Sequence, residues 1–229
     1  MSKTADAGAL PGWAVALAPP VLVVRFGRVL EVASWAIVNG GRRRAEAVAW
    51  LEVRNSDLPP EVDPARLLAD RLEAHGLTGA VGLLTSRRID RFREARADLG
   101  GVVAQALATV GLSNAVAVGD EPGPLAVAGT INVLCALSAP LTEAAAREAL
   151  SVAAEARTAA VLEAQVPSRR SRRLASGTGT DCLVLAWPAG PEPGVPYAGK
   201  HTAVGAAVGR AVREAVAAGV ADWREEYRC

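Results

Sequence analysis

A stripe of valines spaced four residues apart predicts a long helix with one apolar face over residues 202–219. The stripe consists of Val204, Val208, Val212 and Val216. A second apolar stripe with the 3.6-residue helical period predicts another helix over residues 142–165. Each apolar face must be buried against another layer, and strand-like segments occur between these helices and before them. The sequence therefore predicts a mixed α/β (α+β) fold, a single domain over residues 1–229 with a mixed β-sheet and packed helices.

Short apolar runs bounded by turn residues predict the strands of that sheet. Residues 21–26 and 31–38 are predicted to form a hairpin around Gly27 and Arg28. Further strands are predicted at residues 45–53, 80–84, 114–118, 130–137 and 182–187.

Two other parts of the chain have their own patterns. Residues 64–75 are predicted to form a helix that is capped by Asp63 and begins at Pro64. Residues 1–12 are expected to be a loose tail. Gly205 and Gly209 are expected to let the last helix pack closely on a neighbouring element.

The composition narrows the class of protein. The chain is 51% hydrophobic, with a formal net charge of +1, so its charge gives no reason to expect binding to nucleic acid or to an acidic membrane surface. No apolar run approaches the roughly 18 residues of a membrane span. Cys135, Cys182 and Cys229 are too far apart for a CxxC metal site. We therefore expect a cytoplasmic protein with no metal and no membrane partner.

Lys200 and His201 stand out because both residue types are rare in this chain. Its lysines are Lys3 and Lys200, and its histidines are His75 and His201. Lysine provides a compact charge that arginine cannot copy, and histidine exchanges a proton near neutral pH. Residues 194–201 also come close to a phosphate-binding loop, but a histidine stands where the magnesium-binding Ser or Thr belongs.

The second segment whose residues are suited to catalysis or ligand binding is the Gly-Thr-Gly-Thr-Asp turn at residues 177–181. Two glycines permit a tight turn with exposed backbone N–H groups, which can hold an oxyanion. A polar turn at the start of a strand explains the same residues without any function. Asn39 and Asn132 lie at predicted strand ends beside glycines, and turn chemistry alone explains Asn39.

Six segments, in this order, resemble the adenosylcobinamide amidohydrolase family, and the resemblance covers roughly residues 20–220. They are SWAIVNGG (34–41), VGLLTS (81–86), GTIN (129–132), EART (155–158), GTGTD (177–181) and YAGKHT (197–202). The resemblance implies hydrolysis of the amide that joins a corrinoid to its aminopropanol arm. The products would be adenosylcobyric acid and 1-amino-2-propanol, for use in cobalamin salvage. The bulky Trp35 departs from the small residues usual in the family.

A mechanism that combines the residues with the resemblance makes Asp181 and His201 an acid–base pair around a water molecule. Lys200 and the backbone N–H groups of residues 177–180 would face the oxyanion, and Glu155 and Asn132 would hold the substrate amide or the aminopropanol hydroxyl. Thr180 or Thr178 as a covalent nucleophile is the alternative. Further substrate contacts are expected at Asn39, Thr85, Asn132, Thr178, Gly179 and Thr158. Asp181, His201, Glu155 and Asn132 are expected to converge on one cleft.

The same hypothesis expects no cofactor, because the corrinoid is itself the substrate. The expected partner is a small-molecule corrinoid, and assembly into a homo-oligomer is left open. A non-catalytic corrinoid-binding protein and a nucleotide-binding protein that uses residues 194–201 are the alternative functions.

Overall fold

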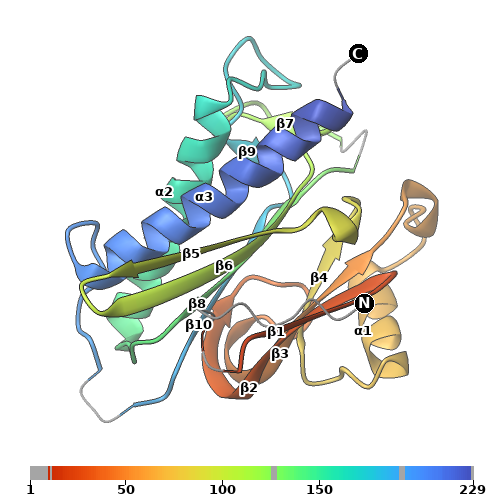
Figure 1. The fold of residues 1–229 in the computed structure, drawn as a ribbon. Coiled ribbons are helices and arrows are strands. Elements are labelled where there is room, and N and C mark those ends of the chain that lie inside the picture. Colours follow the sequence, from red (N-terminus) through yellow and green to blue (C-terminus); the bar gives the residue numbers. More distant parts are fainter. Residues whose placement is uncertain (1–9, 11, 125–127, 191–193, 228–229) are drawn as a thin grey trace.

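A single eight-stranded mixed β-sheet organises the part of the chain that the computed structural model describes, residues 10, 12–124, 128–190 and 194–227 (Figure 1). In chain order the elements are β1 (Ala14–Ala18), β2 (Val21–Ser34), β3 (Gly41–Glu52), α1 (Pro64–Ala74), β4 (Val81–Thr85), β5 (Arg93–Leu99), β6 (Val102–Val110), β7 (Ala115–Val116), β8 (Ile131–Leu137), α2 (Glu143–Glu163), β9 (Gly177–Thr178), β10 (Cys182–Trp187) and α3 (Ala203–Glu226). The predicted mixed α/β class is confirmed.

The strand order of the large sheet is β4-β3-β2-β10-β8-β6-β5, with β1 paired to β2 beside this path. The pairs β3–β4 and β8–β10 are parallel, and the other pairs of the sheet are antiparallel. Strands β7 and β9 form a separate two-stranded antiparallel ribbon. This ribbon lies beyond the end of the sheet at which β8 and β10 begin (Figure 1).

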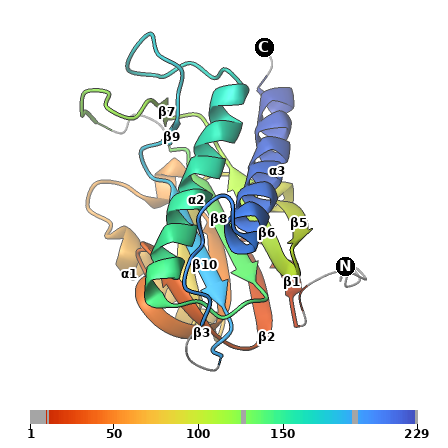
Figure 2. The same cartoon turned by 90° about the vertical axis from the view of Figure 1, so that its left-hand side faces the viewer.

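Side chains alternate between the two faces of the sheet, so each strand contributes to two cores. Along β8, Val133 and Cys135 point toward α2 and α3, whereas Leu134 and Ala136 join the opposite core. Helices α2 and α3 lie side by side on the first face (Figure 2). Helix α1 covers the outer side of β3 and β4 through Leu68.

The sheet curls over on itself. The carboxamide of Asn132 in β8 donates a hydrogen bond of 2.7 Å to the carbonyl of Leu84 in β4, although three strands separate β8 from β4 in the sheet. Twisted sheets accumulate such curvature. The curvature brings strand ends that are far apart in the sheet order into one region.

The predicted hairpin at residues 21–38 is wrong, because residues 21–34 form one strand, β2. Between Arg25 and Leu30 this strand advances five residues while its partner β3 advances only two, from Ala47 to Ala45. Gly27, at φ +66°, therefore belongs to a bulge and not to a turn.

The strands β1, β5, β6 and β9 were not predicted. Strand β5 reads Arg-Glu-Ala-Arg-Ala-Asp-Leu, and charged residues at this density are typical of loops or exposed helices. It forms a strand because it pairs with the almost fully buried β6.

The predicted helices are confirmed, as is the predicted cap at Asp63. The side chains of Asp63, Thr142 and Thr202 accept hydrogen bonds from the first turns of α1, α2 and α3. Helix α3 continues beyond the predicted end at Gly219 to Glu226. Of the predicted tail, residues 1–9 and 11 lie outside the described residues, and the N–H of Leu10 donates to the side chain of Gln105. No helix in the described ranges is both long and apolar enough to cross a membrane.

We predict opposite effects of alanine at two glycines of α3. At Gly205 a Cβ would overlap the backbone carbonyls of Ala198 and Gly199, whereas at Gly209 the nearest atom would be Val152 Cγ1 at 3.6 Å. Gly205→Ala should lower the free energy of unfolding by about 1–3 kcal/mol through overpacking. Gly209→Ala should raise it by about 0.5–1 kcal/mol through helix propensity. Urea denaturation checks both, and equal effects of the two variants would contradict the packing described for α3.

Candidate active site

Asp181 lies at the centre of the turn that precedes β10. Its carboxylate accepts hydrogen bonds from the N–H of Ile131 at 2.9 Å, the N–H of Thr178 at 2.9 Å, the Thr178 hydroxyl and the guanidinium of Arg157. The side chain of Asp181 is only 6% exposed. A Cβ at Gly177 would overlap both charged groups of this pair. One carboxylate therefore joins β8, β9 and α2.

These contacts bear on the expected role of Asp181 as an acid or base. Burial lowers the pKa of the Arg157 guanidinium, whose side chain is 15% exposed. Both carboxylate oxygens of Asp181 are occupied, and no hydrogen bond joins Asp181 to His201 in the described part of the chain. The arrangement gives Asp181 the geometry of a positioning residue, and its expected action with His201 around a water molecule stays a prediction.

The turn is also anchored through its threonines. The hydroxyl of Thr180 donates to the carbonyl of Gly129 at 2.8 Å, and the hydroxyl of Thr130 donates to the carbonyl of Thr180 at 2.8 Å. The Thr178 hydroxyl is engaged by Asp181, as described above. The indole N–H of Trp35 donates to the carbonyl of Asp181 at 2.7 Å. Residues from three separate motifs of the sequence thus meet at one turn.

Three of the residues expected to contact the substrate form hydrogen bonds within the protein itself. Asn132 is 1% exposed and bridges β8 to β4, and Thr85 is 1% exposed and accepts from the N–H of Arg87. Asn39 has a φ of +56° and donates to the carbonyls of Thr78 and Ala80, as turn chemistry predicts. Their roles toward a substrate remain predictions.

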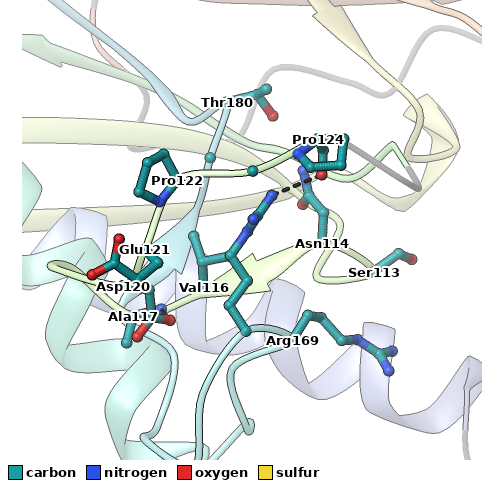
Figure 3. Close-up of a pocket in the computed structure, with 13 residues that line it drawn as sticks. Ser113, Asn114, Val116, Ala117, Asp120, Glu121, Pro122, Pro124, Arg169 and Thr180 are labelled. Carbon is teal, nitrogen blue, oxygen red and sulfur yellow. Dashed lines mark hydrogen bonds between the residues drawn. The ribbon is translucent and has the colours of Figure 1, made fainter.

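A cavity of about 870 Å³ lies beside the turn (Figure 3). It lies between the segment that follows β6, the basic loop before β9 and the Gly177–Asp181 turn. Its lining residues are Ser113, Asn114, Val116, Ala117, Asp120, Glu121, Pro122, Gly123, Pro124, Arg169, Arg170, Gly179 and Thr180. Volumes of this size are typical of small-molecule sites.

The polar groups of the cavity differ in how firmly they are held. Asp120 accepts from the N–H of Ala117 and from Ser168, and hydrogen bonds from Ser168 and Ser171 hold the pKa of its carboxyl below the ordinary value. Glu121 is exposed and forms no hydrogen bond or ion pair within the described residues. The N–H of Gly179 is likewise unpaired among these residues. Glu121 and the Gly179 amide are thus available to a ligand.

Lys200, His201 and Glu155 form a second polar group. The ammonium of Lys200 lies 2.6 Å from the carboxylate of Glu155, and the two side chains are 72% and 53% exposed. His201 is exposed at the start of α3, with no hydrogen bond or ion pair to the described residues. Thr158 lies half-buried on α2 nearby.

The two polar groups lie on different sides of α2. Residues two positions apart on a helix point about 200° apart, so Glu155 and Arg157 leave the helix in nearly opposite directions. Figure 2 shows β9 on one side of α2 and the segment leading into α3 on the other. The expected convergence of Asp181, His201, Glu155 and Asn132 on one cleft is therefore not observed.

The segment 194–201 lacks the features of a phosphate cradle. The N–H of Val195 donates to the carbonyl of Pro140, and the N–H of Ala198 donates to Glu148. These amides would have to face a phosphate in a nucleotide site. Because they are already occupied, the structure gives no support to nucleotide binding here.

Cysteine chemistry does not contribute to the turn. Cys182 follows Asp181 directly but is buried, and burial raises the pKa of its thiol to about 12. Cys135 is also free and buried, with a pKa raised to about 12, and Cys229 lies outside the described residues. No three His, Cys, Asp or Glu side chains in the described ranges are grouped to hold a metal ion.

Comparison with known proteins gives a consistent result. The model of the adenosylcobinamide amidohydrolase family matches residues 13–228. An adenosylcobinamide amidohydrolase of Halobacterium salinarum is 37% identical over 191 residues, which cover 79% of this chain and 76% of that protein. An adenosylcobinamide amidohydrolase of Methanosarcina mazei is 29% identical over 192 residues, which cover 80% of this chain and 86% of that protein.

Solved structures resemble the chain only distantly. The PH0078 protein from Pyrococcus horikoshii OT3 aligns with a TM-score of 0.44 and 13% identity, covering 88% of this chain and 77% of that one. A likeness of this degree assigns no activity.

We predict that the two ion pairs flanking α2 differ strongly in their contribution to stability. Asp181→Asn leaves the buried Arg157 without its counter-charge and should lower the free energy of unfolding by about 3–5 kcal/mol. Lys200→Ala removes an exposed pair and should cost about 0–1 kcal/mol. Chemical denaturation of both variants measures the difference, and a tolerated Asp181→Asn change would show that the turn does not depend on this carboxylate.

Proposed function

The chain belongs to the adenosylcobinamide amidohydrolase family and is an amidohydrolase. We propose that the substrate of this protein is adenosylcobinamide. The bond cleaved is the amide between the corrinoid and its aminopropanol arm. The products are adenosylcobyric acid and 1-amino-2-propanol, which allow salvaged cobinamide to re-enter cobalamin synthesis. We place this reaction in the cytoplasm.

The observation that carries the proposal for the site is the cavity beside the Gly177–Asp181 turn. It combines concavity, apolar walls such as Val116 and Pro122, and unpaired polar groups at its surface. A corrinoid has a large apolar ring system with amide groups at its rim, so it needs both kinds of contact. Lys200 and His201 do not line this cavity.

The proposed mechanism uses water as the nucleophile. Glu121 takes a proton from the water as its oxygen attacks the amide carbon. The N–H of Gly179 donates to the oxyanion that develops on the carbonyl oxygen. The C–N bond then breaks, and the proton held by Glu121 passes to the leaving amine nitrogen.

Thr180 also reaches the cavity. Its hydroxyl proton is directed to Gly129, so its oxygen can accept a hydrogen bond from the attacking water or from the amide N–H. Asp181 and Thr178 hold the turn in place and act through it. Direct attack by Thr180 on the amide carbon is the covalent alternative.

The group of Lys200, His201 and Glu155 supports a competing placement of the same chemistry. Here His201, which forms no hydrogen bond to the described residues, would take the proton from the attacking water. Its separation from the turn by α2 makes it the weaker choice. In that placement Lys200 would face the oxyanion.

Incubation of the purified protein with adenosylcobinamide, followed by mass spectrometry, tests the proposed function. We expect adenosylcobyric acid and 1-amino-2-propanol in equal amounts. Tight binding of the corrinoid without either product would favour the non-catalytic binding protein. An absence of both binding and products would exclude adenosylcobinamide as the ligand.

Steady-state kinetics of matched variants locate the chemistry. Glu121→Gln should lower kcat by roughly 10²–10⁴, because the general base is lost, whereas Glu73→Gln on α1 should have no effect. Thr180→Val should lower kcat, and Thr180→Ser should retain most of it. Lys200→Arg and His201→Asn should stay close to wild type. If these last two variants lose turnover while Glu121→Gln keeps it, the reaction takes place beside α3 instead.

A further inference from the structure

Asn114 has a buried side chain without partners. The residue is 8% exposed, and neither its Oδ1 nor its Nδ2 forms a hydrogen bond within the described residues. A buried carboxamide left unpaired is costly, because it has lost its hydrogen bonds to water. Other unpaired groups, such as the Thr109 hydroxyl and the Trp50 indole N–H, belong to residues that do not line the cavity. Asn114 lines it (Figure 3).

The backbone around Asn114 is adapted to this side chain. A Cβ at Gly129 would lie 2.7 Å from Asn114 Oδ1 and 3.0 Å from the backbone nitrogen of Asn114, so a glycine is needed there. The carbonyl of Gly129 in turn receives the hydroxyl of Thr180. Asn114 and Thr180 therefore both adjoin Gly129, and both line the cavity.

The chemistry of the unpaired group indicates its ligand. A carboxamide presents one acceptor oxygen and one NH₂ donor side by side. Another primary carboxamide satisfies both at once, with its NH₂ on Oδ1 and its oxygen on Nδ2. A carboxylate can only accept hydrogen bonds, so it would leave Oδ1 of Asn114 unpaired. It would also place one of its negatively charged oxygens against that Oδ1 oxygen.

We propose that Asn114 holds a primary carboxamide at the rim of the corrin ring, and so selects corrinoids whose peripheral groups are amides. This inference rests on the proposed function, since it takes the corrinoid as the ligand of the cavity. Asn114 contacts the rim and not the bond that is cleaved. Its contribution is the same in the bound substrate and in the transition state, so it sets KM and leaves kcat unchanged.

The test is Asn114→Leu, which replaces the carboxamide by an apolar group of similar size. KM for adenosylcobinamide should rise roughly 10- to 100-fold at nearly constant kcat. The melting temperature should stay the same or rise, because the variant removes two unpaired buried groups. A merely structural asparagine would give the reverse, a lower melting temperature with an unchanged KM, and that result would overturn the inference.

Thr109→Val is the matched control, since it removes a buried unpaired hydroxyl away from the cavity. It should leave KM unchanged. A rise in KM equal to that of Asn114→Leu would show that the effect is unspecific, and would also overturn the inference.

Equilibrium dialysis keeps this test separate from that of the proposed function. The wild-type protein should bind cobinamide at least tenfold more tightly than a corrinoid whose rim carboxamides are methyl esters, which lack the N–H donors. This preference should shrink in Asn114→Leu. Binding with this preference but no hydrolysis would sustain the inference and refute the proposed function. Hydrolysis of adenosylcobinamide with equal affinity for the amide and the ester corrinoid would sustain the proposed function and refute the inference.

Discussion

The buried ion pair between Asp181 and Arg157 is the contact on which the geometry of the site depends. It ties the turn before β10 to the middle of α2, and the same carboxylate receives the backbone N–H of Ile131 from β8. A buried pair of charges stabilises a fold only when the remaining hydrogen-bonding capacity of both groups is used. Here the carboxylate accepts four hydrogen bonds, which tie the turn that carries Gly179 and Thr180 to β8 and α2, whereas Nε of Arg157 has no partner among the described residues.

The curl of the sheet brings the start of β8, beside this turn, close to the end of β4. Because Asn132 binds the carbonyl of Leu84 across the inside of the curl, the beginning of β8 lies close to the end of β4. Small residues make the opposite face compact: the buried side of α2 consists largely of alanines, such as Ala149 and Ala153, which let α3 approach. The low aromatic content of the chain is consistent with this close helix packing.

Local patterns in the sequence were sufficient for the helices and for most of the core strands. The valine stripe predicts α3, because this signal lies entirely within the helix. The long strand β2 was interpreted as a hairpin, since a glycine bulge and a turn have the same local signature. Strand β5 depends on its partner β6 and has no apolar pattern of its own.

The candidate site shows the same limit. The residues of the Gly177–Asp181 turn made it a candidate site, but the separation of Lys200 from Asp181 arises from the path of α2 between them. Asn114 and Glu121 were not predicted as site residues. The scarcity of asparagine in this sequence was the only signal for Asn114, and an exposed glutamate gives none.

Hydrogen–deuterium exchange with saturating adenosylcobyric acid, the expected product, measures most directly whether the corrinoid occupies the cavity beside the turn. This ligand lacks the aminopropanol arm, so it is not consumed during the measurement. We expect slower exchange in residues 113–124 and 176–182, with no change in residues 196–204. Protection confined to residues 196–204 would place the ligand at Lys200 and His201, and would contradict the assignment of the cavity as the active site.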